Sequence, residues 1–313
     1  MKIAISKAIL LYCLAFFTCT TAFSQFFDRS RGKNVMKIIE SKVIVHANQS
    51  PALNERMKKA FADYWKVSPY ELYDPIKSYE RNSNESLASF MPGIVGLTVR
   101  GHETSMNHPF FIYGEARKDG SVADDAFIGV FPVNGFHYEF DPRAKYYYDR
   151  TLLRIPYIVY NLNDMLVYLK NKESEKGYDD YIAAKTNRLA KKTLIIPKDL
   201  VTEWDVNPAT TALMKGRVEA GQKDMKEIRA AVMDEGDISF GAKYKVMTND
   251  EILKLEQTPD AGNYALFLPA INHHKYIMAF DMGTKELLYF ETVTMGMRIK
   301  SKDFDKMNKA IGF

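Results

Sequence analysis

Short β-branched runs alternate with segments of helical periodicity along this chain, and no other feature restricts its fold more. Runs of the first kind predict buried strands, whereas apolar residues spaced three and four apart predict helices with one buried face. The clearest helix is expected over 144–171, where Ile155, Val159 and Leu162 belong to one apolar stripe. Alternation of this kind is typical of α/β proteins.

The predicted elements follow the same order in two halves of the chain. In the first half we expect strands at 42–47 and 70–73, helices at 51–65 and 85–90, a hairpin of 109–116 with 126–133, and the helix 144–171. In the second half we expect strands at 192–197, 243–247, 264–271, 275–281 and 286–294, and helices that begin at 208, 249 and 302. Thr248 and Glu251 predict a capping box, and Ser301 is the expected cap of the last helix.

This order predicts two similar tandem domains, each a mixed sheet flanked by helices. The first is expected over 42–171 and the second over 192–313, and the charged segment 172–191 between them is expected to be a linker or an exposed helix. The alternative is coincidence, because corresponding strands are not separated by a constant spacing and strand–helix alternation is common.

The first 24 residues have the pattern of a secretory leader. Lys2 and Lys7 begin it, Ala8 to Phe17 form an apolar run, and Ala22-Phe23-Ser24 supplies small residues for cleavage before Gln25. The apolar run is too short for a membrane span, which needs about 20 residues. We therefore expect an exported protein, periplasmic or associated with the outer membrane. The leader resembles those of Bacteroidetes bacteria.

Removal of this leader would also remove both cysteines of the chain, Cys13 and Cys19. The mature chain would begin with a loose segment, 25–41, and would depend on its apolar core without disulfides. The alternative is lipidation of Cys19 in place of cleavage before Gln25. Phe16-Phe17-Thr18 lacks the small residue that usually precedes a lipidated cysteine.

Composition argues against a nucleic-acid partner and against a disordered chain. The net charge of +4 falls to +2 when Lys2 and Lys7 are removed, which gives no strong electrostatic attraction to nucleic acid. An apolar fraction of 46% is typical of globular proteins. We expect no transmembrane span in the mature chain, because the best segment, 151–170, is interrupted by Arg154 and Pro156.

No catalytic template fits the sequence. It has no Gly-x-Ser-x-Gly elbow, phosphate loop or dinucleotide fingerprint, and a cysteine-free mature chain has no thiolate. His102-Glu103 lacks the second histidine that a zinc protease needs four residues on, since Met106 stands there and His108 comes too late. The interpretation we prefer is a polar loop between strands.

The other histidines and paired carboxylates give no stronger signal. Adjacent residues of a strand point to opposite faces, so His273-His274 cannot chelate together and is expected to form a turn. His46 is expected in a strand, and His137 has no visible partner. The pairs Asp124-Asp125 and Asp179-Asp180 are expected in solvated turns. Tyr146-Tyr147-Tyr148 are expected at a helix start or a protein interface. We predict no catalytic, cofactor-binding or metal-binding residue.

The second half contains three segments that resemble a known envelope domain. Residues 244–252 read as a strand that leads into a short helix, 263–268 as the next strand, and 277–289 as a closing hairpin. The hairpin carries Asp281, Thr284 and Glu286 in the order Asp-x-x-Thr-x-Glu. This is similar to the α/β domain shared by the TolB amino-terminal domain and the curli-secretion lipoprotein family, in which a glycine stands at the place of Lys285.

The resemblance covers about residues 192–312, with a fainter echo in 42–140, and it concerns fold and turn chemistry. It implies an exported scaffold that assembles with envelope proteins and has no chemistry of its own. We accordingly expect an assembly or adaptor protein with envelope partners, and an oligomer of the chain is a further expectation. The alternative is an extracytoplasmic hydrolase, or a protein that binds small ligands or glycans, with its site between the halves.

Overall fold

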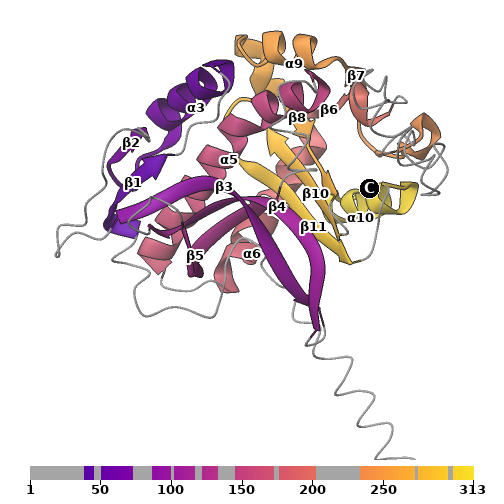
Figure 1. Ribbon diagram of the computed structural model, residues 1–313. Helices are drawn as coiled ribbons and strands as arrows, with labels where there is room; N and C mark the ends of the chain where they lie inside the picture. The colour runs from indigo at the N-terminus through magenta and orange to yellow at the C-terminus, as the bar shows by residue number, and fades with distance from the viewer. Residues whose placement is uncertain are drawn as a thin grey trace, which may run out of the picture.

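The computed structural model describes residues 39–45, 51–72, 87–99, 102–116, 122–132, 145–172, 176–201, 233–271, 274–294 and 299–313. Over these ranges the chain has a mixed α/β fold with two sheets, as the alternation of periodicities predicted (Figure 1). The predicted leader and the helix expected from 208 lie outside the described residues.

The first sheet is built from β1 (Lys42–Val45), β2 (Tyr70–Leu72), β3 (Leu87–Val99), β4 (His102–Ala116) and β5 (Val122–Pro132). Its strand order is β2-β1-β3-β4-β5, with β1 parallel to both of its neighbours and with β3, β4 and β5 antiparallel. The hairpin predicted between 109–116 and 126–133 is confirmed. The helix expected at 85–90 is wrong, because residues 87–90 pair with β1 on one side and with β4 on the other from Ala88 onward, and this long-range ladder outweighs local preference.

The second sheet is built from β6 (Thr193–Pro197), β7 (Tyr244–Met247), β8 (Tyr264–Phe267), β9 (Ala270–Ile271), β10 (His274–Asp281) and β11 (Leu287–Thr294). Its main order is β11-β10-β8-β6-β7, and β9 pairs with β10. Strand β6 is parallel to β7 and β8, whereas β10 is antiparallel to β8 and β11. If β9 is left out and the strands of each sheet are numbered by their order along the chain, the order in space is the same in both sheets: second, first, third, fourth, fifth.

The helices are α3 (Pro51–Tyr64), α5 (Lys145–Lys172), α6 (Lys176–Ala183), α9 (Asn249–Leu255) and α10 (Ser301–Ile311), with short 3-10 helices η2 (Thr186–Lys191), η3 (Lys198–Leu200), η4 (Glu235–Asp237) and η5 (Pro259–Asn263). The capping box of α9 is confirmed, since Glu251 N donates to Thr248 Oγ1 and Thr248 N donates to Glu251 Oε2. In α10 the expectation differs by one residue: Lys300 precedes the helix and its N–H donates to Asp303 Oδ2, so Ser301 is already helical.

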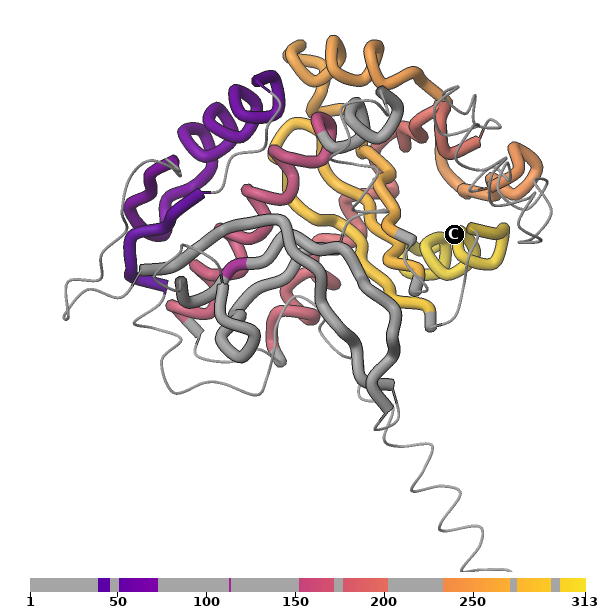
Figure 2. The backbone as a smooth tube through the Cα atoms, in the orientation of Figure 1, coloured from indigo at the N-terminus to yellow at the C-terminus, as the bar shows by residue number. Residues whose placement is uncertain are grey.

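Helix α5 is buried on more sides than its sequence stripe predicts. The stripe is buried at Ile155, Val159 and Leu162, and Tyr157 and Ile158 between these positions are buried as well. The reason is that α5 passes between the N-terminal elements and the strands of the second sheet (Figure 2). Its length is 28 residues. No helix within the described ranges combines the length and the apolar composition that a membrane span requires.

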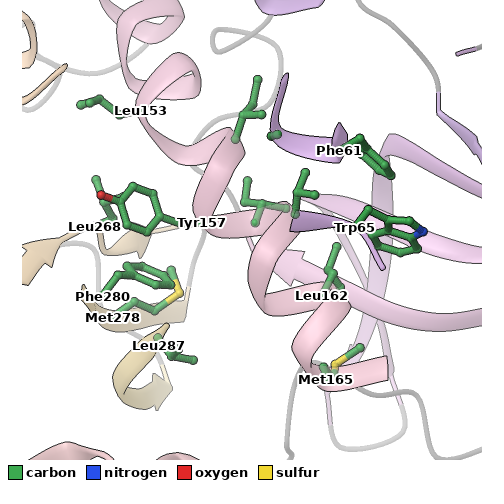
Figure 3. Close-up of a cluster of buried hydrophobic side chains, with 14 of the residues drawn as sticks. Phe61, Trp65, Leu153, Tyr157, Leu162, Met165, Leu268, Met278, Phe280 and Leu287 are labelled. Atoms are coloured by element: carbon green, nitrogen blue, oxygen red, sulfur yellow. The ribbon is translucent and has the colours of Figure 1, made fainter. Parts of the chain in front are cut away.

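One continuous apolar cluster therefore connects both sheets through α5. Figure 3 shows Phe61 and Trp65 on one side of this helix, and Tyr157 directed toward Phe280 on the other. The Tyr157 and Phe280 rings are 5.2 Å apart between centroids. Full burial of each such ring contributes about 2 kcal/mol to folding. A second cluster, on the opposite face of the second sheet, includes Phe304 and Met307 of α10.

The charged segment 172–191 differs from the solvated linker that its composition predicted. Where it is described, it forms α6 and η2, and Tyr178, Ile182 and Leu189 are buried in the two clusters. Charged residues such as Asp180 occupy the exposed positions between them. The segment thus packs against the body of the protein through an apolar face that a count of charges does not reveal.

Candidate functional site at the junction of the two sheets

The main polar site between the two sheets lies next to a proline inside α5. Pro156 has no N–H, so the carbonyl of Leu152, four residues earlier, has no donor within the helix. The Nε of Arg56, from α3, donates to this Leu152 oxygen at 3.1 Å. The proline in α5 thereby leaves an acceptor for a half-buried cation on a neighbouring helix.

The carboxylate of Glu256 lies between two cations. The residue Glu256 directly follows α9. Its carboxylate accepts a hydrogen bond from Arg56 Nη2, and its Oε1 lies 3.0 Å from Lys285 Nζ. The side chains of Glu256 and Lys285 are each only 5% exposed. We call Arg56, Glu256 and Lys285 the junction bridge, because they connect α3, α9 and the turn between β10 and β11.

Lys285 occupies a backbone conformation that favours glycine. Its φ is 70°, the one positive value among the non-glycine residues that the structure describes. A side chain in this region costs on the order of 1 kcal/mol. Burial lowers the pKa of the amine, although the Glu256 carboxylate acts in the opposite direction. The amine also donates to the Met282 carbonyl. The contacts of this side chain therefore offset a strained backbone.

Two residues of α5 hold the same turn from the other side. Asn161 Oδ1 accepts from Leu287 N at 2.8 Å, and Asn161 Nδ2 donates to the carbonyl of Lys285 at 2.8 Å. The ring of Tyr157 lies 5.1 Å from Lys285 Nζ. Burial, followed by the charge of Glu256, raises the pKa of the Tyr157 phenol. Helix α5 thus fixes both the backbone and the side chain of Lys285.

The Asp-x-x-Thr-x-Glu residues build the closing turn itself. Asp281 Oδ1 accepts from Gly283 N at 2.9 Å and from Thr284 N at 3.1 Å. Asp281 Oδ2 lies 2.9 Å from both Arg188 Nη2 and Lys192 Nζ. The predicted turn and its closing hairpin are confirmed for these residues. The residues of the motif form the turn, and their ion pairs with Arg188 and Lys192 anchor the turn to η2.

Glu286 and Asp164 share the amine of Lys185, at 3.2 and 3.4 Å. Glu286 Oε2 also accepts from Arg188 Nη1 at 2.7 Å. Burial opposes the ionisation of Glu286, but the hydrogen bonds from Arg188 and Thr284 and the charge of Lys185 outweigh it and lower its pKa. For Asp164 burial prevails over Lys185 and raises the pKa.

Replacement of Glu286 by glutamine is expected to lower the free energy of unfolding by about 1 kcal/mol at pH 7. Because the pKa of Glu286 is lowered in the folded state, its stabilising effect is complete above the ordinary glutamate value of 4.5 and is lost as pH falls through the lowered value. Urea unfolding at pH 7 and pH 3 should show the difference from wild type shrink at the lower pH. The exposed Glu55→Gln is the control, and an equal difference at both pH values would contradict the account.

The junction bridge and the closing turn together determine how α3, α5, α9 and the second sheet are held against one another. Their charges are opposed at short distances, and Glu256, Lys285 and Asp281 are nearly inaccessible to solvent. In the described part of the chain, no group of three or more His, Cys, Asp or Glu side chains is placed to hold a metal ion. What this arrangement can do physically is fix the relative positions of the elements.

The structure places the histidine and carboxylate candidates of the first half in strands. His102, Glu103 and His108 belong to β4, so the loop expected there is wrong, and Asp124-Asp125 lie in β5 and not in a turn. The reason is that pairing with β3 extends β4 back to His102, and pairing of Val122 with Ala116 extends β5 past Asp124 and Asp125, across register shifts in both ladders. His102 and His108 are about 20 Å apart along β4, at about 3.3 Å per residue.

These groups are not brought together into the hydrolytic site that the alternative would need. Asp125 lies opposite the 114–116 end of β4, about 40 Å along the strand from His102. Asp179-Asp180 belong to helix α6, so the turn expected there is also wrong. His274 begins β10, and Tyr146-Tyr147-Tyr148 lie in the first turn of α5. His46, His137 and His273 lie outside the described residues.

Large apolar side chains are rarely exposed where the structure describes side chains. Tyr244, at 40%, and Phe313, at 61%, are the exposed examples within that part of the chain. An apolar patch of the kind that marks many interfaces is not formed by these residues. Contacts with a partner would therefore have to use another feature of the described surface.

Sequence reasoning did not find the junction bridge. Arg56, Glu256 and Lys285 are up to 229 positions apart in the sequence, and no local pattern connects them. Two signals were available: a proline inside a strongly periodic helix, which leaves a carbonyl free, and a lysine at the glycine position of the hairpin pattern. Comparison of the chain with protein-family models, with curated proteins and with solved structures found no match.

Proposed function

We propose that this chain is an exported protein of the bacterial envelope, periplasmic or associated with the outer membrane, that acts as an assembly or adaptor protein through protein–protein contacts. The leader pattern of residues 1–24 supports export. The junction supports a scaffold role, because its ion pairs connect structural elements that are distant in the sequence. The observation that carries the proposal is a two-stranded extension of the first sheet.

This extension, the β3–β4 ribbon, consists of residues 94–99 and 102–109 (Figure 1). Strand β1 pairs with β3 only over 87–90, and β5 pairs with β4 only over 110–116. Beyond these limits β3 and β4 pair with each other, and no third strand joins them within the described residues. A strand edge with unused backbone groups can accept a strand from a partner.

The proposal includes a duplicated architecture of two similar tandem domains. The equal strand order and equal strand directions of the two sheets support a duplication, with 172–191 between its halves. The resemblance to the TolB amino-terminal and curli-secretion type of domain agrees with such a unit in 192–312. It also agrees with a protein that assembles with envelope components.

Capture from intact cells tests this function. The chain would carry a tag after Phe313, be expressed at native level, and be crosslinked in intact cells before each envelope fraction is analysed. We expect one envelope protein to be recovered in stoichiometric amount. A chain recovered as an unpartnered monomer from every fraction would contradict the proposal, and recovery from the cytoplasm with its leader intact would contradict export.

A further inference from the structure

The segment 176–191 lies along an edge of the second sheet. Strand β11 is the last strand in the order of that sheet, and both α6 and η2 contact it. Within η2, Thr186 Oγ1 donates to the carbonyl of Leu288 in β11 at 2.8 Å. Two apolar side chains of the segment, Tyr178 and Ile182, are buried. We call residues 176–191 the edge strap, because they lie on the edge of β11.

One lysine of the edge strap is shared by two carboxylates from different elements. Lys185 Nζ lies 3.2 Å from Glu286 Oε1, in the turn between β10 and β11, and 3.4 Å from Asp164 Oδ2, in α5. Glu286 also accepts from Arg188 Nη1 at 2.7 Å and from Thr284 Oγ1 at 2.9 Å. The charge of Glu286 is therefore compensated even when Lys185 is shared.

Asp164 is less well compensated than Glu286. Its side chain is 19% exposed, and among the described residues the cation that pairs with it is Lys185 alone. Its other donor is neutral, since Tyr181 Oη donates to Asp164 Oδ1 at 3.0 Å. When two carboxylates share one site, the less compensated one takes up a proton first. In agreement, burial raises the pKa of Asp164, whereas the pKa of Glu286 is lowered.

The phenol of Tyr181 can serve both protonation states of Asp164. A phenol oxygen donates one hydrogen and also accepts, so it can donate to the carboxylate and accept from the neutral acid in the same position. Lys185 Nζ lies 3.7 Å from the centroid of the Tyr181 ring, which stabilises the amine by a cation–π interaction. The contact between α6 and α5 is therefore kept when Asp164 binds a proton, and its buried negative charge is removed.

The other titratable groups around Asp164 do not change charge between neutral and mildly acidic pH. Burial raises the pKa of the phenols of Tyr160, Tyr178 and Tyr181, so these stay neutral. Burial opposes the charge of Lys185, but its contacts with Tyr181 and Asp164 outweigh burial and raise the pKa of the amine. The charged groups beyond Glu286 are paired with one another: Arg188, Lys192 and Asp281.

From this cluster we infer that a proton holds the edge strap closed: Asp164 binds a proton in mildly acidic solution while Glu286 stays ionised, and the strap then opens less often from the edge of β11. An open strap returns Asp164 to water, where the carboxylate is favoured. Each proton bound to the closed form therefore shifts the equilibrium toward closure. This device is independent of the adaptor function, and it makes exposure of the β11 edge greater at neutral pH.

The two carboxylates act on the edge strap in opposite directions. The pKa of Asp164 is raised in the closed form, so its stabilising effect is complete below the ordinary aspartate value of 3.8 and is lost as pH rises through the raised value. The effect of Glu286 is complete above 4.5 and is lost as pH falls through its lowered value. Closure should therefore be favoured as pH falls from 8 to 5.

Hydrogen exchange of the α6 amides in the purified, leader-free full chain tests this device. After correction for intrinsic exchange rates, we expect their protection to rise about threefold from pH 8 to pH 5. Asp164→Asn keeps the shape of the side chain without its charge. It should raise α6 protection at pH 8 above that of wild type and abolish the rise toward pH 5. An ion pair that only stabilises α6 would instead lose protection at pH 8 on this substitution.

Asp180→Asn, exposed on α6, is the matched control and should keep the pH dependence of wild type. Protection of α6 that is unchanged or lower at pH 5 in wild type would overturn the inference, as would a pH dependence that Asp164→Asn retains. Carboxyl ¹³C NMR of the wild-type chain keeps the test independent of how the variant folds. The Asp164 resonance should titrate with a pKa above 3.8, and a value at or below 3.8 would also overturn the inference.

Discussion

Replacement of Glu256 by glutamine is expected to lower the free energy of unfolding by about 3 kcal/mol. The substitution keeps the shape of the side chain but removes the negative charge between Arg56 and Lys285. Both cations then remain near each other in a site from which water is largely excluded. Removal of one partner from a buried ion pair is costly because the remaining charge is not compensated. Urea unfolding at pH 7 measures the effect.

The matched control for Glu256→Gln is Asp63→Asn. Asp63 forms an ion pair with Lys59 on the surface of α3, where its side chain is 40% exposed. Exposed pairs of this kind contribute little, and the control should differ from wild type by less than about 0.5 kcal/mol. Similar small effects for both variants would mean that the junction bridge does not hold the sheets together.

The second large effect is expected at the pair of Lys275 in β10 and Asp303 in α10, whose side chains are each 2% exposed. Lys275→Met alone should cost about 3 kcal/mol, because Asp303 keeps a buried charge without its cation. The double variant Lys275→Met with Asp303→Leu should recover most of this loss. About 1 kcal/mol should remain, since Asp303 Oδ2 also accepts from Lys300 N at the start of α10.

Thermal and urea unfolding of both single variants and of the double variant complete this cycle. A double variant that is as unstable as Lys275→Met would show that apolar replacement cannot fill the site. A Lys275→Met variant as stable as wild type would show that the pair contributes nothing. The second result would contradict a role for the Lys275–Asp303 pair in holding α10 to the second sheet.

Local periodicity was sufficient for elements whose signals are contained in their own residues. Helix α5 was predicted within one residue at each end, because its apolar stripe, from Leu152 to Leu169, extends over about five turns. The capping box at Thr248 was readable because the two residues that form it are three positions apart. The turn at Asp281 was readable because its side chain accepts from residues two and three positions later.

Features that depend on distant parts of the chain were not readable. Strand β3 is defined by its pairing with β1 and β4, and its first residues lack the strict alternation that would have separated strand from helix. The full burial of α5 follows from its position between two sheets, which no pattern within α5 encodes. Arg56 and Glu256 are 200 positions apart and meet only because α3 and α9 both approach α5.

The most direct test of the central claim is a comparison of the full chain with a ribbon-shortened chain in the capture from intact cells. In the shortened chain, Gly93 is joined to Phe110 through Asn-Gly, which removes residues 94–109 and with them the β3–β4 ribbon; Phe110 keeps the N–H that the two-residue turn needs. We predict that this chain is exported and folded, with a thermal unfolding midpoint close to that of wild type, and that it loses the partner recovered by the full chain. Recovery of the same partner in the same amount would show that the ribbon is not the contact on which the adaptor function depends.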